Sequence, residues 1–172
     1  MDRETRTDRR GKRLLDQHDV APAGELHGLP NGPAFDLGGL AATVTILRSR
    51  FRRAPENNNS VIVAAQAGER TILLTGDIER DAERELAGRI GSADVLKIPH
   101  HGSRTSTSDL LLDAVRPRIA VLSCGQYNFF GHPHPSVVAE LRRRRIRLWR
   151  TDLSGTVEMT FRNGSLEVRT EN

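Results

Sequence analysis

The sequence predicts an α/β fold in which a mixed sheet carries helices on its outer face. Apolar segments come first as antiparallel hairpins and then alternate with helical patterns, an order that suits such a sheet. A last pair of apolar segments flanks Asn163-Gly164, a dipeptide typical of a two-residue hairpin turn.

Length and composition predict one main domain. The chain has 172 residues, enough for a core of its own. Residues 1–33 are highly charged at first and then rich in Pro and Gly, so we expect a partly disordered N-terminal segment before a domain at 34–172. No apolar run approaches the roughly 20 residues that cross a bilayer, and the N-terminus has no signal-peptide pattern. As written, the chain is therefore expected to be cytoplasmic, without a membrane segment.

The first half reads as two hairpins and a helix. Gly38-Gly39 and Gly68-Glu69 supply the turns of the hairpins, and Ala82, Leu86 and Ile90 form one apolar stripe of the helix. The apolar runs of the second hairpin favour burial on both faces. The expected elements are strands at 35–37, 40–47, 61–65 and 71–75 and a helix at 80–90.

The second half alternates strands and helices. Ser108 is a suitable N-cap, Pro117 ends the helix that follows, and Pro135 suits the first position of the next helix. The expected elements are strands at 94–99, 119–123 and 146–151, helices at 110–115 and 135–144, and a closing hairpin of 156–161 and 166–169.

The charge pattern is basic and built from arginine. The chain carries 26 Lys+Arg against 22 Asp+Glu, a net charge of +4, and Lys12 and Lys97 are its only lysines. A pI near 10.1 suits a polyanion such as nucleic acid, but solubilising arginines explain it equally well. Cys124 is the only cysteine, so no intrachain disulfide can form.

Three apolar segments end in side chains that can bind a metal. Asp77 follows the first, His100 and His101 follow the second, and His132 and His134 follow the third. Ligands gather at the carboxyl ends of strands in α/β sheets, and the combination of His and Asp suits zinc or manganese. Each feature also has a structural explanation: a helix cap for the aspartate, an ordinary loop for the paired histidines, and a proline-rich helix lead-in for the last two.

The paired histidines are followed by a run of hydroxyl groups. If the strand continues through His100 and His101, the two rings point to opposite sides, and only one of them can face a given metal. Ser103, Thr105 and Ser106 could then hold a phosphate, and we place Asn128 with them as a substrate-binding residue.

Four motifs together resemble a known family. They are LLTGDIE, DVLKIPHHGSRTSTS, RPRIAVLSCG and GHPHPSVVAELRRRRIRLWRTDLSGTV, and NNNSVIVAAQAGERTILLTGD matches the preceding strand pair. From about residue 55 to 160 the chain resembles the C-terminal half of the metallo-β-lactamase-like domain of ComEC-type competence proteins. The resemblance implies a partial αβ/βα sandwich and a metal-dependent, nuclease-like phosphodiesterase. Its substrate would be DNA, and single strands above all, during DNA uptake on the extracytoplasmic face of the membrane.

The resemblance also implies roles for individual residues. Asp77 would be the bridging metal ligand and His101 and His132 further ligands of zinc or manganese, with His100 and His134 as catalytic groups at the substrate.

One family motif is absent from this sequence. No His-x-Asp-x-Asp-His segment occurs, so we expect an incomplete site that needs a partner half-domain or a homo-oligomer. Two alternatives stay open: a truncated gene fragment, and a non-catalytic basic DNA-binding remnant that uses Arg48, Arg50, Arg52, Arg53 and Arg142 to Arg145.

Overall fold

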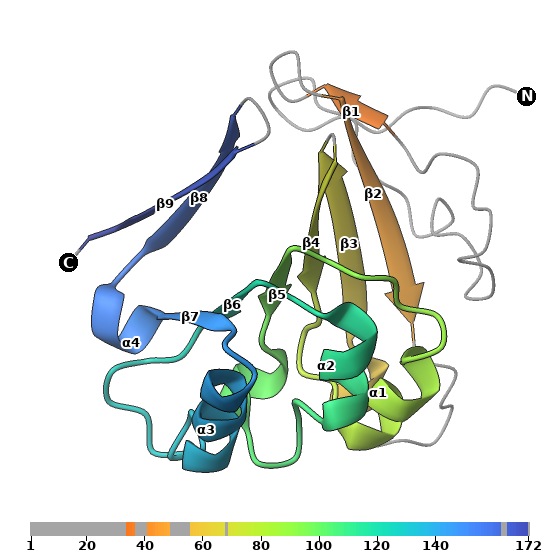
Figure 1. Cartoon of the computed structure of the whole chain (residues 1–172). Helices are drawn as coiled ribbons and strands as arrows, with labels where there is room; N and C mark the ends of the chain where they lie inside the picture. Colours follow the sequence, from red (N-terminus) through yellow and green to blue (C-terminus); the bar gives the residue numbers. More distant parts are fainter. Residues whose placement is uncertain (1–33, 37–40, 49–55, 68, 163–164, 172) are drawn as a thin grey trace, which may run out of the picture.

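The structure is a computed structural model, which describes residues 34–36, 41–48, 56–67, 69–162 and 165–171 (Figure 1). The expected N-terminal segment, residues 1–33, lies outside the described residues, as do the turn positions 38–39 and the basic residues at 50, 52 and 53. None of the helices in the described ranges is both long and apolar enough to span a bilayer.

A seven-stranded mixed sheet forms the centre of the fold, in the order β1-β2-β3-β4-β5-β6-β7. Successive antiparallel pairs join β1 (Ala34–Asp36), β2 (Ala41–Arg48), β3 (Val61–Ala67) and β4 (Arg70–Leu74). The sheet continues with parallel pairing through β5 (Val95–Lys97), β6 (Ile119–Leu122) and β7 (Arg147–Arg150). The predicted change from hairpins to strands separated by helices is confirmed.

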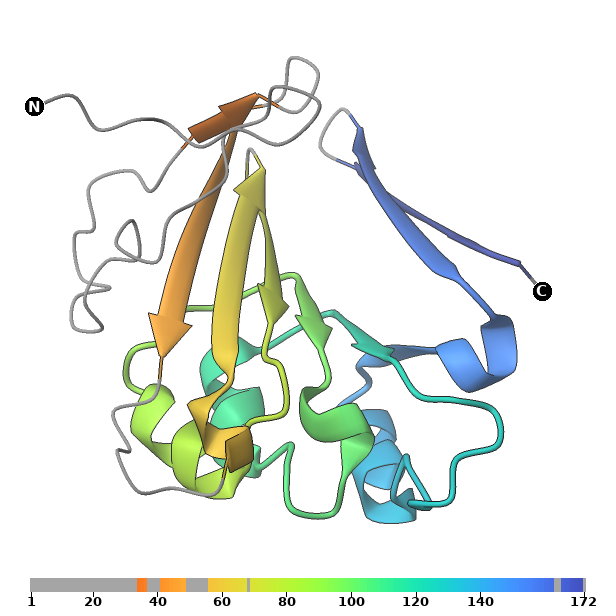
Figure 2. The ribbon, with the colours of Figure 1, turned by 180° about the vertical axis from the view of Figure 1, so that it is seen from behind.

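The three connecting helices lie on one face of the sheet. They are α1 (Arg80–Leu86), α2 (Asp109–Val115) and α3 (Pro135–Arg143). Parallel crossovers share one hand, so a sheet that grows in one direction from β4 to β7 places successive helices on the same side. Figure 1 shows α1 and α2 in front of the sheet, and Figure 2 shows the strands in front.

The core lies between the helices and the facing side of the sheet. Its largest fully buried apolar side chains are Ile62, Leu73, Ile78, Leu86, Leu96, Ile98, Leu111, Leu112, Leu122 and Leu141. Burying each of them contributes roughly 1.5–3 kcal/mol. The opposite face is less covered than the apolar pattern predicts, because Val61 and Leu74 are 40% and 43% exposed. Within the described ranges, helices therefore cover one face of the sheet.

The helix ends follow the predicted signals in part. The hydroxyl of Ser108 accepts a hydrogen bond from the N–H of Leu111 at 3.3 Å, and Pro135 occupies the first turn of α3. Helix α1 ends at Leu86 instead of Ile90, since the N–H groups of Arg89 and Ile90 both bond to the carbonyl of Leu86 in a closing turn.

Short elements complete the chain. The single-turn elements η2 (Glu56–Asn59), η3 (Pro99–Gly102) and α4 (Thr151–Ser154) escape sequence prediction. The closing hairpin, β8 (Val157–Arg162) and β9 (Ser165–Thr170), pairs antiparallel as expected and forms a separate two-stranded sheet. In Figure 1 it rises from α4 at the left of the view, beside the main sheet.

Candidate functional site

The carboxyl ends of β4, β5 and β6 meet at one edge of the sheet because the three strands are parallel. Asp77 follows β4, the histidine pair lies in η3 after β5, and Ser123 follows β6. A hydrogen bond of 3.1 Å from the N–H of His100 to the carbonyl of Gly76 links the first two segments. Asp77 and the histidine pair, two of the three predicted groups, therefore lie at the same edge of the sheet, whereas His132 lies in the loop that leads to α3.

The backbone at Asp77 is held by the segment before β3. The hydroxyl of Ser60 accepts a hydrogen bond of 3.1 Å from the N–H of Asp77. Gly76 has φ of +57°, and a Cβ there would lie 2.8 Å from the Cβ of Ser60, so the turn requires glycine. The helix-cap explanation for Asp77 does not hold, because the N-cap position of α1 is Glu79.

The histidine pair has an unusual backbone. The strand ends at Lys97, and His100 and His101 both have left-handed conformations, with φ of 46° and 52°. The expectation of alternating side chains along a continued strand is therefore wrong. A left-handed residue other than glycine costs about 1–2 kcal/mol, and such strain concentrates at functional sites.

The side chains of His101 and Asp77 approach each other at the edge of the sheet. The Nδ1 atom of His101 lies 2.6 Å from the carbonyl oxygen of Ser123, which can only accept, so Nδ1 donates in this hydrogen bond and the lone pair of a neutral ring is on Nε2. That Nε2 lies 3.5 Å from Oδ1 of Asp77. Two atoms bound to one zinc ion at about 2.1 Å and a tetrahedral angle lie about 3.4 Å apart. Metal-binding histidines typically donate their other N–H to a carbonyl or carboxylate, so this pair fits zinc or manganese.

His100 lies beside a carboxylate and a second histidine. Its Nδ1 is 3.1 Å from Oε1 of Glu79, although the buried nitrogen has no well-aligned hydrogen bond within the part of the chain described. Its ring centroid is 5.7 Å from that of His132 and 6.5 Å from that of His101. Sequence reasoning missed Glu79, although it lies in the same motif as Asp77.

His132 is fixed by its own loop. The side chain of Asn128 accepts from the N–H of His132 at 2.9 Å and donates to its carbonyl at 2.7 Å. Burial lowers the pKa of His132, and the neighbouring His100, His101 and His134 lower it further. A lowered pKa favours the neutral imidazole that a metal ligand requires.

His134 caps helix α3. Its Nδ1 accepts from the N–H of Ser136 at 3.3 Å and lies 2.7 Å from the Ser136 hydroxyl. Because Nδ1 accepts, a proton on the neutral ring is at Nε2. Its own N–H donates to the carbonyl of Gly102 at 2.8 Å, which joins the lead-in of α3 to the histidine turn.

The predicted substrate-binding side chains brace the loop that carries the histidines. The Ser106 hydroxyl is 1% exposed and donates to the carbonyls of Pro99 and Ser103. Ser103 contacts the hydroxyl of Thr105, which donates to Oε1 of Glu79 at 2.9 Å. Asn128 is engaged with its own loop. Contact of these four with a substrate stays a prediction.

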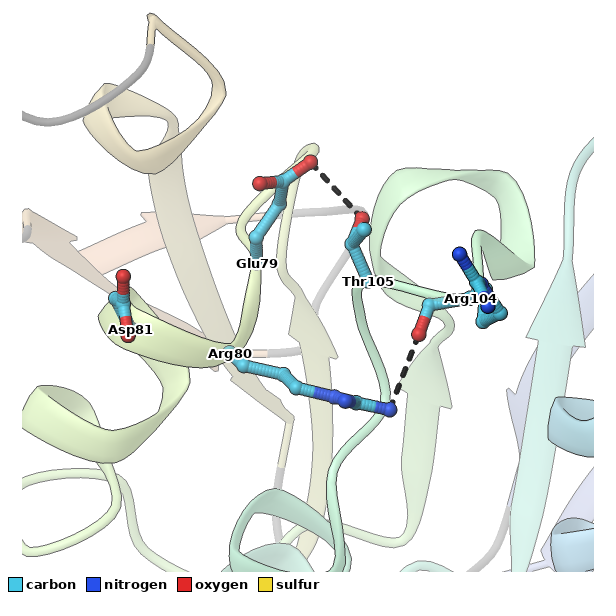
Figure 3. Close-up of a pocket in the computed structure, with 5 residues that line it drawn as sticks. All are labelled: Glu79, Arg80, Asp81, Arg104 and Thr105. Carbon is cyan, nitrogen blue, oxygen red and sulfur yellow. Dashed lines mark hydrogen bonds between the residues drawn. The ribbon is translucent and has the colours of Figure 1, made fainter.

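An open pocket of about 580 Å³ adjoins the site. Its lining residues are Glu79, Arg80, Asp81, Arg104 and Thr105 (Figure 3). The figure shows Glu79 and Thr105 joined by a hydrogen bond, with Arg80 reaching towards the backbone of Arg104. We call His100, His101 and His132 the histidine cluster. Glu79 lines this pocket and also lies beside His100 of that cluster.

Lys97 is a further group that sequence reasoning missed. Its Nζ lies 3.9 Å from Oδ1 of Asp77 and 3.4 Å from the carbonyl of Gly76. Burial lowers the pKa of Lys97, and Asp77 opposes that change. One of only two lysines in an arginine-rich chain was a signal that could have identified it.

The site residues form two neighbouring pairs. Asp77 contacts His101, and His132 contacts His100. Among the described residues, no three His, Cys, Asp or Glu side chains lie close enough together to bind one metal ion.

The arginine run on α3 is engaged elsewhere. Arg144 pairs with Asp109 and Asp113, and both Arg143 and Arg144 pair with Glu140. These ion pairs engage Arg143 and Arg144 within the fold, which argues against a DNA-binding surface that uses the whole run.

Comparison with known proteins agrees with the motifs. The chain is 40% identical to Recombination protein 2 of Haemophilus influenzae over 66% of its residues, 38% identical to ComE operon protein 3 of Bacillus subtilis over 64%, and 36% identical to Competence protein ComA of Neisseria gonorrhoeae over 70%. It covers 14%, 14% and 18% of those proteins. No protein-family model matches it. The chain is thus similar to one segment of much longer competence and recombination proteins.

Proposed function

We propose that this chain provides part of a metal-dependent phosphodiesterase site that cleaves DNA. The observation that carries the proposal is the position of His101, whose protonated Nδ1 is held by Ser123 while Nε2 lies 3.5 Å from Asp77. An imidazole and a carboxylate presented in this way form a preorganised cation site. The relatives named for competence, and the basic pI near 10.1, agree with a nucleic acid as substrate.

Asp77 and His101 would hold zinc or manganese, and His132 is the nearest candidate for a third ligand. A bound divalent ion would stabilise negative charge on a phosphoryl oxygen as a Lewis acid. His132 would join them by a movement of its ring, which already contacts His100 and whose lowered pKa favours the neutral form.

The other residues position the phosphate and move protons. Glu79 lies 3.1 Å from Nδ1 of His100, and Nε2 of His100 would exchange a proton with the leaving group or with water. His134 holds its proton at Nε2 because Nδ1 caps α3, so it can donate to a phosphate oxygen. Lys97 adds a positive charge beside Asp77.

The proposed site requires further ligands. The sequence contains no His-x-Asp-x-Asp-His segment, and each relative extends well beyond the matched region. We infer that a partner half-domain, or a second copy of this chain, completes the site and forms the second layer of an αβ/βα sandwich. The exposed Leu74 and Val61 lie on the sheet face that this layer would cover. The resemblance to ComEC-type competence proteins also implies that the site would act on the extracytoplasmic face of the membrane.

The test is a cleavage assay on labelled single-stranded DNA with Mn²⁺ or Zn²⁺, with and without a chelator. We expect weak cleavage that requires the metal and falls at least tenfold in Asp77→Asn and in His101→Ala. Leu153→Ala, on α4, is the matched control and should cleave as the unmodified chain does. Cleavage that persists in both site variants, or in the presence of the chelator, would contradict the proposal.

A further inference from the structure

Three exposed aromatic side chains stand in one short loop. The chain has one Trp, one Tyr and five Phe, and three of these occupy the loop between β6 and α3. Tyr127, Phe129 and Phe130 are 87%, 103% and 81% exposed. We call the segment that carries Tyr127, Phe129 and Phe130 the aromatic loop. Figure 2 shows this connection extending away from the sheet. Large exposed apolar groups that cluster mark an interaction surface.

The loop is built to hold these rings outward. The Asn128 side chain, between Tyr127 and Phe129, donates to the carbonyls of Gly125 and His132 and accepts from the N–H of His132. The side-chain amide of Asn128 thereby joins both ends of the loop. The neighbouring rings of Tyr127 and Phe129 are exposed to solvent. A surface fixed before binding loses little conformational entropy when a ligand arrives.

The aromatic loop is continuous with the candidate site. The ring of Phe130 stacks on that of His132, with centroids 6.0 Å apart and an angle of 17° between the planes. His132 in turn lies 5.7 Å from His100. A ligand that rests on Phe130 therefore reaches the histidine cluster directly.

We propose that the aromatic loop is a stacking platform for unpaired nucleobases, which holds a single strand while its phosphate enters the histidine cluster. This inference rests on the proposed function and adds the residues that select the strand. Every base has a π-face that stacks on an aromatic ring, with an effect of about tenfold or more on affinity for each base. In a duplex these faces are already stacked on each other, so the loop favours single strands.

A lipid surface is the weaker interpretation. A loop inserted into a bilayer would carry the stacked Phe130–His132 pair with it and would cover the polar histidine cluster with lipid, which costs free energy. A flexible nucleic acid strand contacts the rings with its bases and the cluster with its phosphates at the same time.

The test measures binding without cleavage. Fluorescence anisotropy, with the full chain and a chelator present, compares oligothymidylate with an abasic oligomer of equal length and charge. We expect the chain to bind oligothymidylate about tenfold more tightly. Phe129→Ala and Tyr127→Ala should remove that preference and leave binding of the abasic oligomer unchanged, because fully exposed rings contribute little to the fold. Phe129→Trp should retain the preference, and so should Leu153→Ala, the exposed apolar control.

Three outcomes would overturn the inference. The first is equal affinity of the unmodified chain for the two oligomers. The second is an equal loss of affinity for both oligomers in Phe129→Ala. The third is that Phe129→Ala weakens binding to phosphatidylglycerol vesicles but changes binding to neither oligomer. Asp77→Asn separates the two proposals. If it retains the base-dependent binding while no variant cleaves DNA, the aromatic loop stands and the phosphodiesterase proposal fails.

Discussion

The Nε2 atom of His101 lies 3.5 Å from Oδ1 of Asp77, although 23 residues separate the two positions and both follow different strands. Parallel pairing of β4 with β5 places both at one sheet edge, and the left-handed turn at His100 and His101 directs the second imidazole to the aspartate. A backbone carbonyl, that of Ser123, fixes the ring. The local fold therefore brings together the imidazole and the carboxylate on which the proposed chemistry depends.

Replacing Lys97 should tighten the binding of divalent cations. Its ammonium group lies 3.9 Å from Asp77, so it stands close to any cation that Asp77 binds. Two positive charges about 4 Å apart repel each other by roughly 1–4 kcal/mol, depending on the local dielectric. Lys97→Met is expected to bind Mn²⁺ about tenfold more tightly in a calorimetric titration. Lys97→Arg keeps the charge and should bind as the unmodified chain does. Weaker binding in Lys97→Met would show that the lysine supports the site instead.

Gly102 should be irreplaceable in the histidine turn. It has φ of +76°, and a Cβ would lie 2.9 Å from both Leu122 Cδ1 and Pro133 Cβ. Gly102→Ala combines a strained backbone with overpacking, and we expect a loss of about 2–4 kcal/mol in urea unfolding. Gly125→Ala is the control, because nothing lies within 4 Å of the added Cβ. Equal stability of the two variants would contradict the close packing of this turn.

Glu83 should anchor the hydroxyl-rich loop. It is fully buried in α1, and its carboxylate accepts from the N–H groups of Thr107 at 2.5 Å and Ser108 at 2.7 Å. Burial raises the pKa of Glu83 in spite of these bonds. Glu83→Ala leaves both N–H groups without their acceptor and is expected to cost about 2–5 kcal/mol in urea unfolding. Glu83→Gln keeps one oxygen acceptor and should lose less. A neutral effect of Glu83→Ala would mean that water replaces the carboxylate.

Acid should weaken the ion pairs at the C-terminal end of α3. Hydrogen bonds from Arg143 and then Arg144 lower the pKa of Glu140 to about 2 from its usual 4.5. A carboxylate with a lowered pKa stabilises the fold above its unfolded pKa, and this contribution is lost as the pH falls from about 4.5 to about 2. The stability advantage of the unmodified chain over Glu140→Gln, measured by thermal unfolding, should therefore shrink across that interval. An advantage that is constant with pH would exclude this ion pairing.

The sequence predicted that Asp77 and the histidine pair lie at one edge of the sheet, but not the contacts between them. Strand ends are visible as apolar runs followed by Asp77 or by the histidine pair, and parallel strands place such ends together. The left-handed conformations of His100 and His101 have no comparable signature, because residues other than glycine rarely adopt them. The hydrogen bond from His101 to Ser123 joins a side chain to a backbone carbonyl, and any residue can supply a carbonyl.

The roles of the hydroxyl groups could not be predicted from the sequence either. Composition identifies Ser103, Thr105 and Ser106 as polar, but the choice between binding a phosphate and bracing a loop depends on Glu79 and Glu83, which come from a distant segment. The apolar runs of β3 and β4 likewise predicted two covered faces, whereas Leu74 is 43% exposed in the residues described.

Imidazole nitrogen NMR of His101 during a zinc titration tests the central claim most directly. The free chain should show a proton on Nδ1 and none on Nε2, and zinc should shift the Nε2 signal while Nδ1 keeps its proton. The same titration of Asp77→Asn should leave the His101 signals nearly unchanged. A proton on Nε2 in the free chain, or a zinc response of His101 that does not depend on Asp77, would contradict a shared cation site at this edge of the sheet.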